Sequence, residues 1–291
     1  MANTQALKGR IRSVAKTKQI TSAMQLVAAS RMRRAQEATK ASAPYTAAAR
    51  ELLSALAGHT SVKGHPLFAQ RPVKTRLLVV IASDSGLAGA FNSNLTRLYA
   101  NQLIADDKNG VKNATITVGR KASQFVARLK DTTVLGSYEG LPDRPDGNEL
   151  HAILGTIEQK FTSGEVDAVD IIYTRYVNTV KQEAQVMRVL PAGADLNMDA
   201  PTSGVRDVLY EPSTEEVLDG VAYRLVGAQL FQALLESRAS EYSMRMMAMK
   251  NATDNASDLI DDLTLEMNKA RQAAITQELS EISGGVEALN D

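Results

Sequence analysis

The last eighty residues constrain the fold more than any other part of the chain. Residues 212–291 contain no proline beyond their first residue and no glycine pair before Gly284-Gly285. Ser213 and Glu216 have the spacing of a capping box, which satisfies free backbone amides where a helix begins. One helix of this length spans roughly 110 Å at about 1.5 Å per residue, more than the depth of an ordinary globular core. Such a helix needs a partner along its length.

A second long helix is predicted over residues 1–57, where strong helix formers are dense and no glycine occurs between Gly9 and Gly58. Its apolar residues form three groups with four-then-three spacing, and the groups differ in phase, which argues against a strict heptad seam. The groups are Leu7, Ile11 and Val14; Ile20, Met24 and Val27; and Ala28, Met32 and Ala35. Pro44 lacks an amide donor, so we expect a kink or a break near residues 41–43.

The region between the two helices has the pattern of a small α/β domain over residues 75–190. Strands and helices alternate as in a mainly parallel sheet, and the apolar run at 75–83 is typical of a strand buried on both faces. The last two strands follow each other closely enough to form a hairpin. The expected strands are 75–83, 115–118, 133–135, 168–176 and 182–190, and the expected helices are 92–105, 121–129 and 149–161. Residues 58–74 are interpreted as a linker and 191–211 as a loop.

The simplest partner for the final helix is the first helix, packed antiparallel to it. On the final helix, Ala252, Leu259, Leu263 and Ala274 belong to an apolar stripe, and the 252–263–274 spacing of eleven predicts a nearly straight or only weakly supercoiled pair. Eight basic residues precede the first acid, Glu37, whereas the chain from Asp254 onward has nine acids and two bases. The antiparallel arrangement places these opposite charges side by side, although exposed ion pairs stabilise by only about 0–1 kcal/mol each.

The predicted fold is therefore α/β plus long helices. An antiparallel coiled coil of the N-terminal helix (1–57) and the C-terminal helix (212–291) carries an inserted, Rossmann-like α/β domain (75–190). Cysteine is absent, which excludes disulfides and thiolate chemistry. The longest apolar run is too short to span a membrane, so membrane association would require a partner protein.

Catalytic and cofactor motifs are weak. Gly86-Leu-Ala-Gly89 follows a strand as phosphate loops do, but both the Gly-Lys-Ser/Thr ending and the three-glycine fingerprint are missing. Three histidines have no metal-ligand spacing, and no serine has a nucleophile-elbow context. We expect no catalytic residue, no cofactor and no metal.

Other function classes stay open at this level. The basic N-terminal stretch can belong to a structural coiled-coil adaptor, to a rod that binds nucleic acid, or to a rod with an acidic protein partner. It lacks the interleaved aromatic residues typical of nucleic-acid binding. An enzyme built on the α/β insertion is a weaker alternative that depends on a nucleotide at Gly86–Gly89.

Three stretches resemble the gamma subunit of bacterial F-type (proton-translocating) ATP synthases. Residues 20–36 read ITSAMQLVAASRMRRAQ, residues 236–256 read ESRASEYSMRMMAMKNATDNA, and residues 268–282 read NKARQAAITQELSEI. The resemblance is strong at both ends and extends in outline across the middle. One departure is Val286 after Gly285, where that family usually has alanine.

The resemblance implies a central-stalk rotor that couples proton flow to ATP synthesis or hydrolysis by rotation, without catalysis of its own. Its implied partners are the alpha and beta subunits of the catalytic ring, the epsilon subunit and the membrane ring of c subunits, with no nucleic acid and no direct membrane insertion. The implied place is the cytoplasmic face of the cell membrane, as a peripheral subunit of the complex. Beta-subunit contact is implied for Met24, Arg271, Gln272 and Thr276.

Overall fold

A computed structural model describes residues 2–56, 65–130, 132–142, 148–193 and 214–290. The chain divides into two compact units, one of residues 1–28 with 245–291 and the other of residues 29–244, and each is described by itself. The helices are α1 (Ala2–Leu56), α2 (Phe91–Lys108), α3 (Arg120–Val126), α4 (His151–Thr162) and α5 (Thr214–Asn290), with short 3-10 turns η2 (Pro66–Phe68) and η3 (Asn148–Leu150). The strands are β1 (Thr75–Ile81), β2 (Lys112–Val118), β3 (Thr133–Tyr138), β4 (Ala168–Tyr176) and β5 (Gln182–Leu190).

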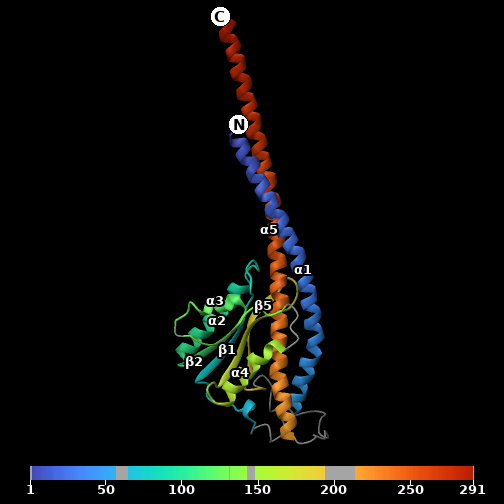
Figure 1. Cartoon of the computed structure of the whole chain (residues 1–291), viewed down its shortest axis with the longest axis vertical. Helices are drawn as coiled ribbons and strands as arrows, with labels where there is room; N and C mark the ends of the chain where they lie inside the picture. The colour runs from blue at the N-terminus through green and yellow to red at the C-terminus, as the bar shows by residue number, and fades with distance from the viewer. Residues whose placement is uncertain (1, 57–64, 131, 143–147, 194–213, 291) are drawn as a thin grey trace. The chain divides into compact units, whose positions relative to one another are not determined.

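The larger unit is built on one five-stranded sheet of order β3-β2-β1-β4-β5 (Figure 1). Strands β1 to β4 pair in parallel, and β5 returns antiparallel to β4. The predicted α/β alternation and the closing hairpin are therefore confirmed. The prediction for β3 is too short, because a register shift beside Thr115 and Ile116 lets pairing continue from Gly136 to Tyr138, through residues expected to form a loop.

The central strand β1 shows why its sequence is a continuous apolar run. Leu77, Val79 and Ile81 belong to the core shared with α4 and α5, whereas Leu78 and Val80 belong to the core shared with α2 and α3. Successive side chains of a strand point to opposite faces, so a strand covered on both faces needs an apolar residue at every position.

Helix α1 continues through Pro44 without interruption, so the expected break near residues 41–43 is wrong. The proline removes one amide donor, but neighbouring residues are held by tertiary contacts. The Ser42 hydroxyl donates to the Gln232 side chain on α5, and Ala49 packs against the main core. These contacts hold the helix on both sides of the proline, so the local defect does not end it.

In the smaller unit, α1 packs against α5 with a seven-residue period, so the expectation of no heptad seam is wrong. The inward-facing positions of α1 are Leu7, Ile11, Val14, Lys18, Thr21, Gln25 and Ala28. Ile20 and Val27, predicted to face inward, are 60% and 53% exposed. Polar residues occupy part of the seam, and for this reason a count of apolar residues does not reveal it.

The facing segment of α5 follows the same period. Met249, Ala256 and Leu263 are buried at intervals of seven, whereas Leu259, expected on the stripe, is 44% exposed. A seven-residue repeat favours a left-handed supercoil, whereas the spacing of eleven predicted a nearly straight or only weakly supercoiled pair. The antiparallel orientation is confirmed, because Thr21 contacts Thr253 whereas the earlier residues Lys8 and Arg12 line a pocket with the later residue Arg271.

The expected N-cap Ser213 lies outside the described residues, and α5 begins at Thr214. At the other end α5 continues beyond Gly284-Gly285 to Asn290. Among the described residues, no helix is long and apolar enough to cross a membrane.

Candidate partner interface

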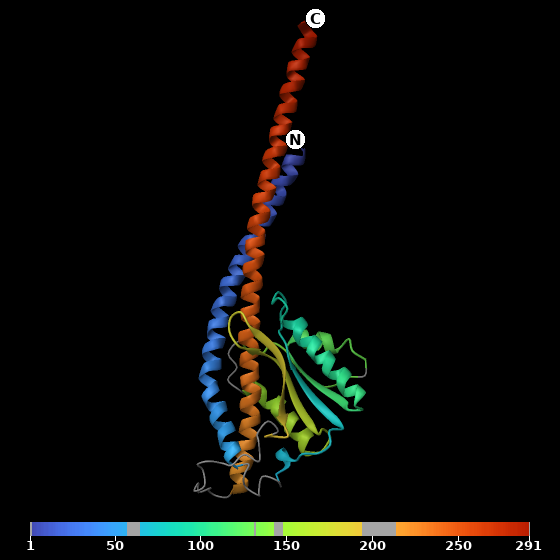
Figure 2. The same cartoon turned by 180° about the vertical axis from the view of Figure 1, so that it is seen from behind.

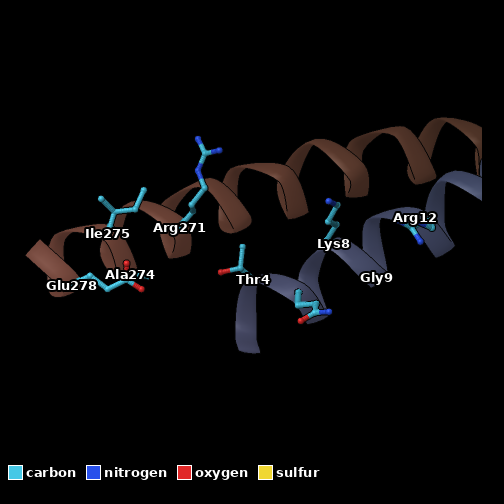
Figure 3. Close-up of a pocket in the computed structure, with 9 residues that line it drawn as sticks. Thr4, Lys8, Gly9, Arg12, Arg271, Ala274, Ile275 and Glu278 are labelled. Carbon is cyan, nitrogen blue, oxygen red and sulfur yellow. The ribbon is translucent and has the colours of Figure 1, made fainter. Parts of the chain in front are cut away.

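A groove lies between the first turns of α1 and the last third of α5, within the smaller unit. Thr4, Lys8 and Arg12 line it from α1, and Arg271, Ala274, Ile275 and Glu278 are among its lining residues on α5 (Figure 3). Its volume is about 700 Å³. At Gly9 a side-chain carbon would meet no other atom within 4 Å. The two helices therefore leave open space on this side, although Leu7 on the neighbouring side of α1 is buried in the seam.

The groove is predominantly basic. Lys8, Arg12 and Arg271 contribute three cations, and Glu278 contributes one carboxylate. In Figure 3 the Lys8 side chain reaches toward α5, whereas the Arg271 guanidinium extends away from α1. Clustered charge of one sign attracts groups of the opposite sign and speeds their association. This groove suits an acidic partner.

The basic start of α1 and the acidic part of α5 are not joined by direct ion pairs where the structure describes them. In the described part of the chain, no ion pair joins the basic residues at 8–18 to the acidic residues at 254–266. The buried seam, rather than paired charges, holds these helix segments together. The basic residues at 8–18 therefore stay available to solvent or to another chain.

Helix α5 extends beyond the start of α1, as both views show (Figures 1 and 2). Thr21 faces Thr253, so Ala2, nineteen residues earlier on α1, lies level with about residue 272 of the antiparallel α5. Residues 273–290 then project past α1, a length of about 27 Å at 1.5 Å per residue.

The projecting segment carries an exposed apolar stripe. Ile275, Leu279 and Ile282 are 49%, 59% and 64% exposed, at the four-then-three spacing of one helix face. With about 100° per residue, Arg271, Gln272 and Thr276 share this face within an arc of about 140°. We call these six residues the α5 tip face. Exposed apolar side chains grouped on one face mark a surface that another chain covers.

Three of the four sequence-derived contact residues therefore gather on one surface, and the fourth does not. Arg271, Gln272 and Thr276 are exposed on the α5 tip face, whereas Met24 is half-buried in α1. Met24 is twelve residues beyond Arg12, about 18 Å along the helix. It lies instead on the same helix face as two exposed apolar residues, Ile20 and Val27, which are four residues before it and three residues after it.

Sequence reasoning missed two parts of this surface. The proximity of Lys8 and Arg12 to Arg271 depends on the pairing of chain ends and has no local signal. The apolar stripe did have a signal, since Ile275, Leu279 and Ile282 have helical spacing. Only its exposure distinguishes it from the packed seam.

The glycine turn at 86–89 connects β1 to α2, and hydrogen bonds within the chain hold the residues on either side of it. The Asp84 carboxylate accepts from the backbone amides of Arg120 and Gly140 at 3.0 and 3.2 Å, and the Asn92 side chain accepts from the Ser83 amide at 3.2 Å. No group of three or more side chains suited to a metal occurs among the described residues.

Comparison with known proteins covers the chain almost completely. A family model described as ATP synthase matches residues 3–289. A protein named ATP synthase gamma chain from Ralstonia nicotianae is 41% identical over 99% of this chain and 100% of its own length. A protein of the same name from Stenotrophomonas maltophilia is 40% identical, with the same coverage.

Solved structures show the same architecture. A chain of the Tetrahymena thermophila mitochondrial ATP synthase central stalk and c-ring matches with a TM-score of 0.64 and 26% identity, over 80% of this chain and 99% of that one. A chain of the Euglena gracilis mitochondrial ATP synthase matches with a TM-score of 0.69, over 99% of this chain and 95% of that one. At 18% identity this second match concerns the fold alone.

Proposed function

Because the chain belongs to the ATP synthase gamma-chain family, we propose that it is the rotating central stalk of an F-type ATP synthase. It couples proton flow through the membrane sector to ATP synthesis or hydrolysis at sites on the beta subunits. The observation that carries the proposal is the α5 tip face, an exposed apolar and basic surface at the end of an antiparallel helix pair. We expect other subunits of an assembly to cover such a surface.

A shaft requires stiffness and a surface that differs from side to side. The buried heptad seam supplies the stiffness, since Leu7, Ala28 and Leu263 are each at most 5% exposed. The asymmetry is at the tip. The apolar stripe occupies one side, and Gln277 and Glu281, linked by a 2.9 Å hydrogen bond, lie on the other.

Asymmetry is what allows a non-catalytic rod to drive catalytic subunits. A bound element shifts another protein's conformational equilibrium only if it binds the alternative conformations with different free energies. As the shaft turns, each beta subunit meets the apolar face, then the polar face. Arg271, Gln272 and Thr276 are the residues we assign to direct contact with beta subunits, and Met24 to a separate contact lower on the shaft.

The remaining partners follow from the same role. The alpha and beta subunits surround the helix pair, and the epsilon subunit and the c-ring bind the rotor outside that ring. The chain itself neither binds nor hydrolyses ATP, and it is peripheral, held at the cytoplasmic face of the membrane through its partners.

A cross-link tests the assignment without interference, because the chain has no cysteine of its own. Thr276→Cys is paired with a single cysteine in the facing loop of a beta subunit, and the assembled complex is oxidised. We expect steady-state ATP hydrolysis to fall at least about tenfold, a change of about 1.4 kcal/mol in the barrier, and to recover on reduction. Arg128→Cys, in the exposed turn after α3, is the matched control and should leave turnover unchanged.

Full turnover with the link at position 276 intact would contradict contact during rotation. ATP hydrolysis by the isolated chain at the rate of an assembled ATPase would contradict its non-catalytic role. The alternative function, nucleic-acid binding, requires that the chain binds nucleic acid and that this binding weakens steeply with salt. Binding measurements on the same purified chain test it.

A further inference from the structure

A second cavity lies in the larger unit, between α1, α4 and α5. It has a volume of about 480 Å³, within the range of about 300–1,000 Å³ typical of small-molecule sites. Leu150, Leu154 and Ala228 form a buried apolar floor, while Tyr45, His151 and Arg224 lie at an exposed rim. We call this cavity the three-helix groove. It does not include the residues of the α5 tip face.

A glycine keeps the floor of the three-helix groove open. A side-chain carbon added at Gly227 would lie 3.3 Å from the Cδ1 atom of Leu154. That contact is tighter than ordinary van der Waals packing, so any larger residue at position 227 would fill space that the groove now leaves free.

The charge of the groove has one sign. Arg224 supplies a fixed cation at the rim, His151 supplies a ring N–H group, and among the described residues none that lines the groove is acidic. Tyr45 and Tyr223 add aromatic rings on either side. An apolar floor with one cationic edge is complementary to a molecule with an apolar body and an anionic end.

We propose that the three-helix groove binds a small amphipathic monoanion, with an aromatic or branched aliphatic body and one carboxylate or sulfonate. The apolar body lies on Leu150 and Leu154 next to Gly227, and the anionic group pairs with Arg224. The groove lies between three helices, so a ligand that binds only the folded chain raises the free energy of unfolding, and tighter binding raises it more.

The test uses the full chain with labelled leucine methyl groups and naphthalene-1-sulfonate as the probe, followed by NMR titration. We expect saturable shifts of the Leu150 and Leu154 methyl signals. Arg224→Gln should weaken the apparent Kd about tenfold, as expected for loss of one charge-assisted hydrogen bond. Uncharged naphthalene should bind the native chain more weakly by a similar factor.

Two further variants complete the design. Gly227→Leu should abolish the Leu154 shift, and Arg128→Gln, which removes a cation from the turn after α3, should change nothing. Equal binding by Arg224→Gln, or shifts confined to Leu265 and Leu279 on the last part of α5, would overturn the proposal. Loss of the Leu150 and Leu154 methyl shifts in the assembled complex, because another subunit covers the groove, would also contradict the proposal. The groove would then be a protein interface.

Discussion

The hydroxyl oxygens of Thr21 on α1 and Thr253 on α5 lie 2.8 Å apart, so a hydrogen bond joins the two helices inside their apolar seam. Thr253 Oγ1 also lies 2.8 Å from the Met249 carbonyl oxygen, to which it can donate. The Thr21 hydroxyl likewise lies 3.1 Å from the Lys18 carbonyl oxygen. Each hydroxyl has one proton, so one of the two threonines donates across the seam while the other donates along its own helix. The pair fixes the register of the two helices with polar residues.

Replacing either threonine by valine removes this bond while keeping the side-chain shape. We expect Thr21→Val and Thr253→Val each to lower the free energy of unfolding by about 0.5–1.5 kcal/mol. The double variant should cost less than the sum, because both changes remove the same bond. Urea unfolding measures this, with Thr17→Val, which bonds only the Ser13 carbonyl of its own helix, as the control. Strictly additive losses would show that the two hydroxyls do not interact.

The α5 tip face should contribute to assembly and not to folding. Leu279→Ser with Ile282→Ser removes two exposed apolar side chains, so the melting temperature of the isolated chain should change little. Affinity for the alpha–beta ring should fall by about 2–4 kcal/mol, the scale of burying two such side chains. Calorimetric titration of the ring measures it. Gln277→Ser on the opposite side is the control, and an unchanged Kd for the double variant would remove the tip face from the interface.

A buried charge network holds the sheet to α2. Asp170 on β4 is 1% exposed and bonds the guanidinium groups of both Arg76 and Arg188. Arg76 also pairs with the buried Asp106 on α2 at 3.0 Å. Asp170→Asn leaves the partly buried Arg188 without this counter-charge and Arg76 with Asp106 alone, and we expect a loss of about 3 kcal/mol of stability, the lower end for a broken buried ion pair. Thermal unfolding measures the loss, with the exposed Asp107→Asn as the control; a change below about 1 kcal/mol would mean that solvent reaches these groups.

Glu236 on α5 should make stability depend on pH. Burial raises the pKa of its carboxyl above the ordinary value of 4.5, and the hydrogen bond from Gln232 only partly opposes this. The folded chain therefore binds this proton more tightly than the unfolded chain. The resulting stability is present below the unfolded pKa and is lost as pH rises through the raised folded pKa.

Glu236→Gln removes the buried charge, so the variant should be more stable than the native chain at neutral pH. The difference should shrink as pH falls toward 4.5 and Glu236 takes up its proton. Melting temperatures across this range measure it, with Glu37→Gln on the exposed side of α1 as the control. A constant difference at all pH values would point to packing and not to charge.

Much of the fold could be predicted because local patterns reflect burial directly. The continuous apolar run of β1 predicted a strand covered on both faces, and the strand–helix alternation predicted a parallel sheet. The failures have a common cause. Ile20 and Val27 have the spacing of a packed face, yet Thr21 occupies the seam, because a threonine on the partner helix satisfies it.

The candidate interface could likewise be predicted only in part from the sequence. The sequence by itself determined two long helices around an α/β insertion, since helix propensity, strand alternation and the lack of breakers act over short stretches. Only the tertiary structure decided that α1 continues through Pro44, that Lys8 and Arg12 lie beside Arg271, and that Ile275, Leu279 and Ile282 stay uncovered. The physical reason is that helix continuity, register and exposure depend on contacts between segments more than 180 residues apart, which no local pattern specifies.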